Sequence, residues 1–242
     1  NTVTVDGRPM IPYDVEVDSV WKTDGARGLE SDGVLELFQV EGPFKACRAS
    51  NEAVYPGIRL DRTLVLTDRI ILDLFRVIGT GPHQYDYAMH IGGRPSTATE
   101  YASAAPLRGI GYDHLKNVRT IRAPAGIADL TWETAGSPLR AVLQADEGSE
   151  FLLADDPATE KAQAFGALEP LPRSSALVVR SRGDQAMFLS MWSTEAHNLE
   201  MIVEDGRADG DVVVRTQIGS QVERWHLPCA AGEVTSEQLP TP

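Results

Sequence analysis

Residues 62–77, RTLVLTDRIILDLFRV, decide the fold class of this chain. Before the polar break TDR, Leu64 and Leu66 alternate with threonine and valine. After the break, Leu72 and Leu74 alternate with the intervening side chains. A period of two is typical of a strand with one buried face, because successive strand side chains point to opposite faces. Two such runs joined by a short polar turn predict an antiparallel β-hairpin.

The same alternation recurs along the chain and predicts an all-β protein. It is present at residues 33–40, 176–182, 186–193, 199–204 and 211–218. Turn signals rich in Gly and Asp separate these runs at residues 181–184 (SRGD), 204–207 (EDGR) and 209–211 (DGD). Regularly spaced strands with such turns predict one large antiparallel β-sandwich, supersandwich-like, over a single domain 1–242.

Helix is expected in one place at most. Residues 156–165 begin with Asp156, which can cap a helix, and Pro157, which suits the first helical position. We expect one or two helical turns there, inside a loop.

The composition is that of a globular protein and excludes two classes of partner. Of the 242 residues, 42% are hydrophobic and 24% are charged, so a sizeable core is expected. No apolar run approaches the roughly 20 residues that a membrane-spanning helix needs. The formal net charge of −13 opposes binding to nucleic acid and to anionic lipid. We therefore expect no nucleic acid and no membrane as partner, and the bacterial periplasm and cytoplasm stay equally open as compartments.

Arginines and aspartates crowd the predicted hairpin. A local basic patch is one interpretation, but solvent-facing arginines paired with nearby aspartates are the simpler one. The residues concerned are Arg59, Arg62, Arg69 and Arg76 with Asp61, Asp68 and Asp73.

The two cysteines, Cys47 and Cys229, lie far apart in the sequence. Two cysteines do not make a disulfide framework. We favour two separate buried thiols over one bridge, because free cysteine is among the most often buried residues. The redox compartment is therefore left open.

The densest polar cluster is HQYDYAMH at residues 83–90. On a strand, His83, Tyr85, Tyr87 and Met89 share one face, and Gln84, Asp86, Ala88 and His90 share the other. Asp86 and His90 can therefore converge. We interpret His83, Asp86, Tyr87 and His90 as a structural hydrogen-bonded network, because buried polar groups are usually satisfied. A metal site and a role in substrate contact or catalysis are the alternatives.

A second cluster, GIGYDHLKNVR, occupies residues 109–119. Tyr112 and His114 are candidates for substrate binding, or for an acid–base pair that moves a proton next to a carboxylate. We favour the alternative, a loop whose aromatic side chains pack over the edge of the sandwich. His197 and His226 are expected in surface or structural positions. The sequence contains no Gly-rich phosphate loop, no HExxH motif and no nucleophile elbow.

Three stretches together resemble the heparinase II/III-like polysaccharide lyases. Residues 1–7 (NTVTVDG) are similar to the family segment His-Asn-Thr-Val followed by a strand that ends in Asp-Gly. Residues 62–90 are similar to that family's hairpin and its His-x-Tyr-Asp-Tyr-x-x-His stretch. Residues 176–192 (ALVVRSRGDQAMFLSMW) are similar to a later hairpin. Residues 55–77, with 111–115, look closer to the alginate and oligoalginate lyase branch.

The resemblance implies a C-terminal β-sandwich that follows an α/α toroid in one polypeptide. Such enzymes cleave uronate-containing polysaccharides, such as alginate or heparin- and heparan-like polymers, by β-elimination. The usual catalytic Tyr and Asn or His lie in the toroid, and a His-x-His stretch supplies a further His. Several members hold a structural divalent metal with that stretch, an Asp after it and the His before Asn-Thr-Val. This sequence has no His-x-His. We therefore assign no catalytic residue, metal ligand or cofactor to residues 1–242, and expect the metal ligands of the parent enzyme upstream of Asn1.

The expected function is that of a lyase domain that is inactive alone and forms one wall of the substrate cleft. Its expected partners are the upstream toroid and, through the full-length enzyme, an acidic polysaccharide. One alternative is a non-catalytic carbohydrate-binding or scaffold module, and another is a stand-alone jelly-roll-type metalloenzyme that uses Asp86 and His90. A missing partner domain also predicts an apolar surface patch, which can pair with itself in a homodimer.

Overall fold

The computed structural model describes residues 2–8, 10, 15–17, 20–22, 32–96, 100–108, 112–134, 136–156, 174–195 and 198–240. These residues form strands β1 to β18, and their only helical segment is a 3-10 turn at Pro124–Gly126. The all-β prediction is confirmed. The helix expected at residues 156–165 lies, beyond Asp156, outside the described residues. None of the described helical segments is long and apolar enough to cross a membrane.

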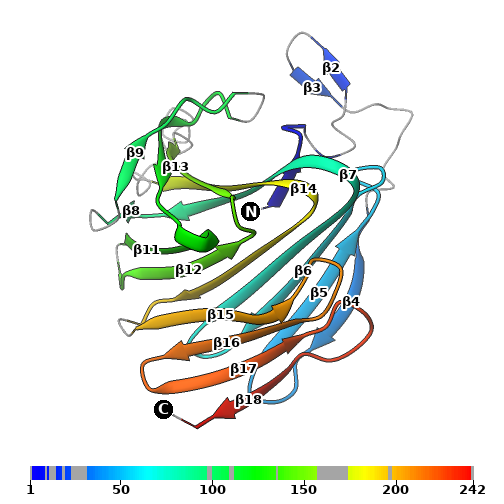
Figure 1. The fold of residues 1–242 in the computed structure, drawn as a ribbon, viewed down its shortest axis with the longest axis vertical. Coiled ribbons are helices and arrows are strands. Elements are labelled where there is room, and N and C mark those ends of the chain that lie inside the picture. Colours follow the sequence, from blue (N-terminus) through cyan, green and yellow to red (C-terminus); the bar gives the residue numbers. More distant parts are fainter. Residues whose placement is uncertain are drawn as a thin grey trace, which may run out of the picture.

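The strands belong to three antiparallel sheets (Figure 1). The twelve-stranded sheet contains β1 (Thr2–Val5), β4 (Val34–Gln39), β5 (Lys45–Asn51), β6 (Arg59–Leu66), β7 (Ile71–Gly92), β8 (Arg94–Pro95), β9 (Tyr101–Ser103), β10 (Lys116–Ile121), β11 (Ile127–Glu133), β12 (Leu139–Ala145), β13 (Glu150–Asp156) and β14 (Ser174–Ser193). The four-stranded sheet contains β15 (Leu199–Gly206), β16 (Val212–Ile218), β17 (Gln221–Leu227) and β18 (Thr235–Leu239), and a small third sheet contains β2 (Val15–Val17) and β3 (Val20–Lys22).

The predicted hairpin at residues 62–77 is confirmed. Strand β6 pairs with β7 from Arg59↔Ile78 to Leu66↔Ile71. Thr67 closes the turn: its backbone N–H donates to the carbonyl of Ile70 at 3.0 Å. The side-chain hydroxyl of Thr67 also accepts the backbone N–H of Ile70 at 3.0 Å. A short polar stretch with a threonine at its start therefore forms the turn that the sequence predicts.

The turn predicted at residues 181–184 is wrong, because β14 runs straight through it. Strands β7 and β14 pair over almost their whole length, from Ile71↔Trp192 to Gly92↔Ser174. The register shifts between Gly183 and Gln185, opposite residues 79–82 of β7. The neighbouring strand pairs with β14 on both sides of this shift, so the Gly-containing stretch continues the strand. The extra residues of the bulge lie in β7, at residues 79–82. The two strands expected at residues 176–182 and 186–193 are thus one strand of twenty residues.

The bulge divides the large sheet into two halves that share β7 and β14. The first half has the strand order β4-β5-β6-β7-β14-β12-β11-β8, and residues 71–78 of β7 lie in it. In the second half, residues 85–88 of β7 pair with β1, and residues 174–180 of β14 pair with β13. The sheet curves so strongly that side chains of its two halves meet. The ring of Tyr87 lies 5.6 Å from Phe75 and 5.4 Å from Phe188, measured between ring centroids.

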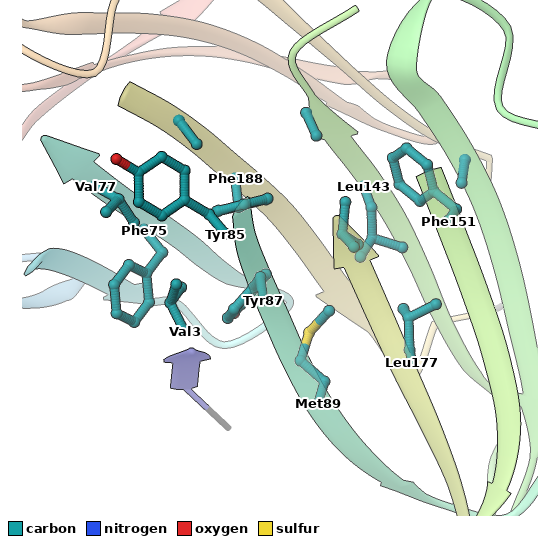
Figure 2. Close-up of a cluster of buried hydrophobic side chains, with 14 of the residues drawn as sticks. Val3, Phe75, Val77, Tyr85, Tyr87, Met89, Leu143, Phe151, Leu177 and Phe188 are labelled. Atoms are coloured by element: carbon teal, nitrogen blue, oxygen red, sulfur yellow. The ribbon is translucent and has the colours of Figure 1, made fainter. Parts of the chain in front are cut away.

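The core consists of three layers of apolar side chains. The first fills the concave side of the large sheet and includes Val3, Phe75, Tyr87, Leu143, Phe151 and Phe188 (Figure 2). The second lies between the first half of this sheet and the four-stranded sheet, and includes Leu72, Leu74, Val214 and Trp225. The third, which includes Leu107, Tyr112 and Val178, lies on the outer face of the second half. Burial of apolar area on both faces of one long curved sheet is the main favourable contribution to this fold.

The two cysteines are separate free thiols, and each is half-buried. The expectation of two unbridged thiols is therefore confirmed, although neither is fully buried. Cys47 lies on β5, and Cys229 follows β17.

Candidate functional site

The polar stretch at residues 83–90 lies on β7, where its two faces have different surroundings. Tyr85, Tyr87 and Met89 point into the concave core (Figure 2). Ala88, from the other face, packs against the third apolar cluster. The alternation predicted from the sequence is therefore correct for these residues, because the strand is regular beyond the bulge.

Asp86 is the centre of a buried cluster that joins four segments of the chain. Its carboxylate accepts two hydrogen bonds from Arg180 of β14, at 2.7 and 2.9 Å. It also accepts the hydroxyl of Tyr112 at 2.6 Å, and the hydroxyl of Thr4 donates in turn to that of Tyr112 at 2.8 Å. The Nε2 of Gln84 donates to it at 3.3 Å. A carboxylate with no solvent exposure needs such partners, since an unpaired buried charge is very costly.

Tyr112 is placed as a hydrogen-bond donor to this carboxylate. Its side chain is buried, and burial together with the charge of Asp86 raises the pKa of its phenol. A phenol with a raised pKa stays protonated at neutral pH, so in this geometry Tyr112 donates a proton in a hydrogen bond rather than accepting one as a base. His114 lies two residues further on and is half-buried. Tyr112 packs in the third apolar cluster. Substrate contact by Tyr112 or His114 stays a prediction.

A second carboxylate cluster lies on the concave face of the sheet. Tyr87 Oη donates to Asp73 at 2.5 Å, and Arg62 donates to the two Asp73 oxygens at 2.9 and 2.7 Å. The guanidinium of Arg62 also lies 5.6 Å from the centroid of the Phe75 ring. Burial and the charge of Asp73 raise the pKa of Tyr87. Tyr87 and Asp86, which are neighbours in sequence, therefore belong to different clusters on opposite faces of β7.

The histidines pair with separate aspartates rather than with each other. His83 Nδ1 lies 2.8 Å from Asp6, and His90 Nδ1 lies 2.7 Å from Asp156. Asp86 and His90, which the alternation could bring together, have different partners. Among the described residues no group of three His, Cys, Asp or Glu side chains could hold a metal ion. His226 pairs with Asp211 through Nε2 at 3.0 Å, whereas His197 lies outside the described residues.

Two arginines that share one aspartate join the twelve-stranded sheet to the four-stranded sheet. The sequence did not predict this contact. Asp61, which is fully buried, accepts the Nη2 of Arg48 at 2.7 Å and lies 3.4 Å from the Nη1 of Arg76. Arg48 donates to the carbonyls of Cys229 and of Ala230, and Arg76 donates to that of Leu227. These carbonyls lie at the last residue of β17 and directly after it, so the guanidinium groups bridge the sheets.

The interpretation of the hairpin arginines as solvent-facing holds only in part. Arg62 pairs with Asp73 and Arg59 with Asp61, each at an intermediate exposure. Arg76 is fully buried, which corrects the prediction for this residue. Arg69 pairs with Glu195, at 2.9 and 2.7 Å.

A pocket of about 160 Å³ opens between the β6–β7 turn and the four-stranded sheet. Arg69, Glu223 and Trp225 contribute to its lining. Burial raises the pKa of Glu223, the charge of Arg69 opposes this, and Asp68 adds to it. Asp68 and Glu223 both line this pocket. Their carboxylates disfavour an anionic sugar there, since like charges repel.

No known protein-family profile matches the sequence, and no curated protein matches it. Solved structures that match this chain include heparinases and a heparan sulfate lyase. A heparinase III structure matches with a TM-score of 0.54 and 11% identity, over 99% of this chain and 29% of that chain. Another heparinase III structure matches with a TM-score of 0.54 and 10% identity, over 99% and 29%. Heparan sulfate lyase HepC from Pedobacter heparinus matches with a TM-score of 0.50 and 10% identity, over 99% and 30%.

Residues 55–77 suggested the alginate and oligoalginate lyase branch. These matches do not support that branch. The chain spans about 30% of the length of the lyases it matches. At such low identities the similarity shows the fold alone. The chain therefore has the antiparallel β-sandwich fold seen in heparinase III.

Proposed function

We propose that this chain is the β-sandwich domain of a polysaccharide lyase that cleaves a uronate-containing polymer by β-elimination. The observation that carries the proposal is the extent of the fold match. It spans 99% of this chain and only 29% of a heparinase III chain, as expected for one domain of a larger enzyme. The sequence resemblance at residues 1–7, 62–90 and 176–192 supports the same assignment.

The catalytic groups of the enzyme lie, in this proposal, outside residues 1–242, in a toroid domain of the same polypeptide. Two buried tyrosines support this division. Tyr112 and Tyr87 are buried, each bonds to a carboxylate, and each has a raised pKa. Such phenols hold a local structure together and are poorly placed to exchange a proton with a long polymer.

The residues described do not by themselves fit the structural divalent metal that the resemblance implies. No three potential ligands among them come together, and the histidines that do pair with aspartates lie in three separate places. If the enzyme holds this metal, its ligands come mainly from elsewhere in the polypeptide.

The charge of the chain limits its part in holding the substrate. A domain with a net charge of −13 repels an acidic polysaccharide over the range of the Debye length, which is about 8 Å at physiological salt. We therefore infer that the basic groups that neutralise the uronate carboxylate belong to the partner domain, and that this domain supplies a wall of the cleft.

The test is a lyase assay on two proteins, the product of the complete reading frame and residues 1–242. Each is incubated with heparan sulfate, heparin or alginate, and the unsaturated uronate product is followed by its ultraviolet absorbance. We expect turnover of a heparan-type polymer by the complete product and none by residues 1–242. Turnover by residues 1–242 contradicts the division of labour. Binding of a polymer by these residues, with no turnover by the complete product, favours a carbohydrate-binding module instead.

A further inference from the structure

Large apolar side chains are exposed at one end of the large sheet. Strands β4, β5 and β6 form this end, away from β9 to β13 (Figure 1). The exposed fractions are 63% for Leu35, 68% for Phe38, 51% for Leu66 and 45% for Ile71. Single exposed apolar residues are ordinary, whereas a contiguous group of them marks an interaction surface.

The strand register places these side chains on one face. Phe38 is opposite Cys47, Cys47 is opposite Leu64, and Leu64 is opposite Asp73. In the next row, Leu66 is opposite Ile71, which in turn is opposite Trp192. Directly opposite residues of paired strands point to the same side of a sheet.

This face is the concave side of the sheet. Asp73 bonds to Tyr87, which belongs to the concave core, and Trp192 packs against that same core. The second half of the sheet covers the concave side of β7, β12 and β14, as the buried residues of the core show. The outer strands extend beyond this cover, so no layer formed by the described residues lies above their apolar side chains.

An irregularity in β4 brings Leu35 onto this face with Phe38. The register of β4 against β5 shifts between Leu35 and Leu37. Leu35 is opposite Ala49 on the concave side, whereas Leu37 is opposite Arg48 and packs against the second core. One extra residue in a strand reverses the side to which the following residues point. We call Leu35, Phe38, Cys47, Leu64, Leu66 and Ile71 the open face.

We propose that the open face is where the rest of the polypeptide docks. This inference rests on the proposed function, which implies a partner domain but not where it binds. The matched region is 29–30% of the heparinase and heparan lyase chains. In the proposed enzyme, most of the polypeptide therefore lies outside residues 1–242 and is available to cover the face. The side chains that define the open face are apolar. The charged side chains beside them on the same face are Lys45, opposite Leu66, and Arg62, which pairs with Asp73. The face therefore suits a mainly apolar protein surface.

Cys47 is a natural reporter on the open face, and Cys229 is a reference outside it. Both thiols are free and half-buried. The experiment labels the native product of the complete reading frame with a maleimide and measures each cysteine in peptides by mass spectrometry. Two variants test docking, Phe38→Asp and Leu66→Asp. Ile202→Asp is the matched control, since Ile202 is an apolar residue of β15 that is 41% exposed.

We expect docking to protect Cys47. The rate of Cys47 labelling, divided by the rate of Cys229 labelling, should be about tenfold lower in the unmodified protein than in the Phe38→Asp and Leu66→Asp variants. In the unmodified protein the docked domain must open before Cys47 can react. Ile202→Asp should leave the ratio unchanged. Phe38 is mostly exposed on an edge strand, so Phe38→Asp should keep the sandwich folded, and circular dichroism of the variants checks this.

Three results would overturn the docking inference. One is a Cys47 to Cys229 ratio that is the same in the unmodified protein and in Phe38→Asp. Another is a reading frame that encodes no further domain. The third is a dimer that Phe38→Asp converts to a monomer, which would place a second copy on the open face. Lyase turnover is independent of these readouts: turnover without protection of Cys47 leaves the proposed function standing, and protection without turnover leaves docking standing.

Discussion

Replacement of Asp86 with asparagine should destabilise this protein far more than the same change at a surface ion pair. Asparagine keeps the shape of the side chain but removes the charge and one acceptor oxygen. The guanidinium of Arg180, whose side chain is 14% exposed, then lies beside a neutral group, and Tyr112 loses a carboxylate acceptor. The change therefore leaves a largely buried cation without its partner.

The size of the effect follows from this geometry. Removing one partner of a buried ion pair costs about 3–5 kcal/mol. One oxygen of asparagine can still accept a hydrogen bond, so we expect the lower end, about 3 kcal/mol. For a domain of this size, each kcal/mol shifts the melting temperature by roughly 2–4 °C, so Asp86→Asn should lower it by about 6–12 °C.

The measurement is thermal and urea unfolding of three proteins: unmodified, Asp86→Asn and Asp155→Asn. Asp155 is the matched control, since it accepts bonds from Arg119 and Asn117 at 2.8 Å each but is 54% exposed. An exposed pair of this kind is worth about 0–1 kcal/mol. Equal shifts for the two variants would refute the reasoning, because burial of the charge would then make no difference.

A further change tests the packing of β7 at the register shift. Gly79→Ala should lower the melting temperature, because its Cβ would lie 2.5 Å from the hydroxyl of Tyr85, whereas Gly81→Ala, with nothing within 4 Å, should not.

Local alternation was enough to predict the fold class and the faces of the main strands. Residues 62–77 form the expected hairpin, and Tyr85, Tyr87 and Met89 share one face of their strand as expected, a face that lies in the core. This succeeds because the period of two is a property of the backbone, so each strand needs only its own sequence to specify its faces. The turn at residues 181–184 failed for the same reason: a polar, Gly-containing stretch has the composition of a turn whether it reverses the chain or bends within a sheet.

The sequence by itself determined an all-β sandwich and the side to which most strand residues point. Tertiary structure alone decided which polar groups meet: Tyr112 with Asp86 across 26 positions, and Arg48 with the carbonyl of Ala230 across 182. It also decided that β14 continues through residues 181–184, since β7 supplies the backbone partners on both sides. The physical reason is range: side-chain alternation is fixed within a few residues, whereas ion pairs and strand pairing depend on segments that only the completed fold brings together.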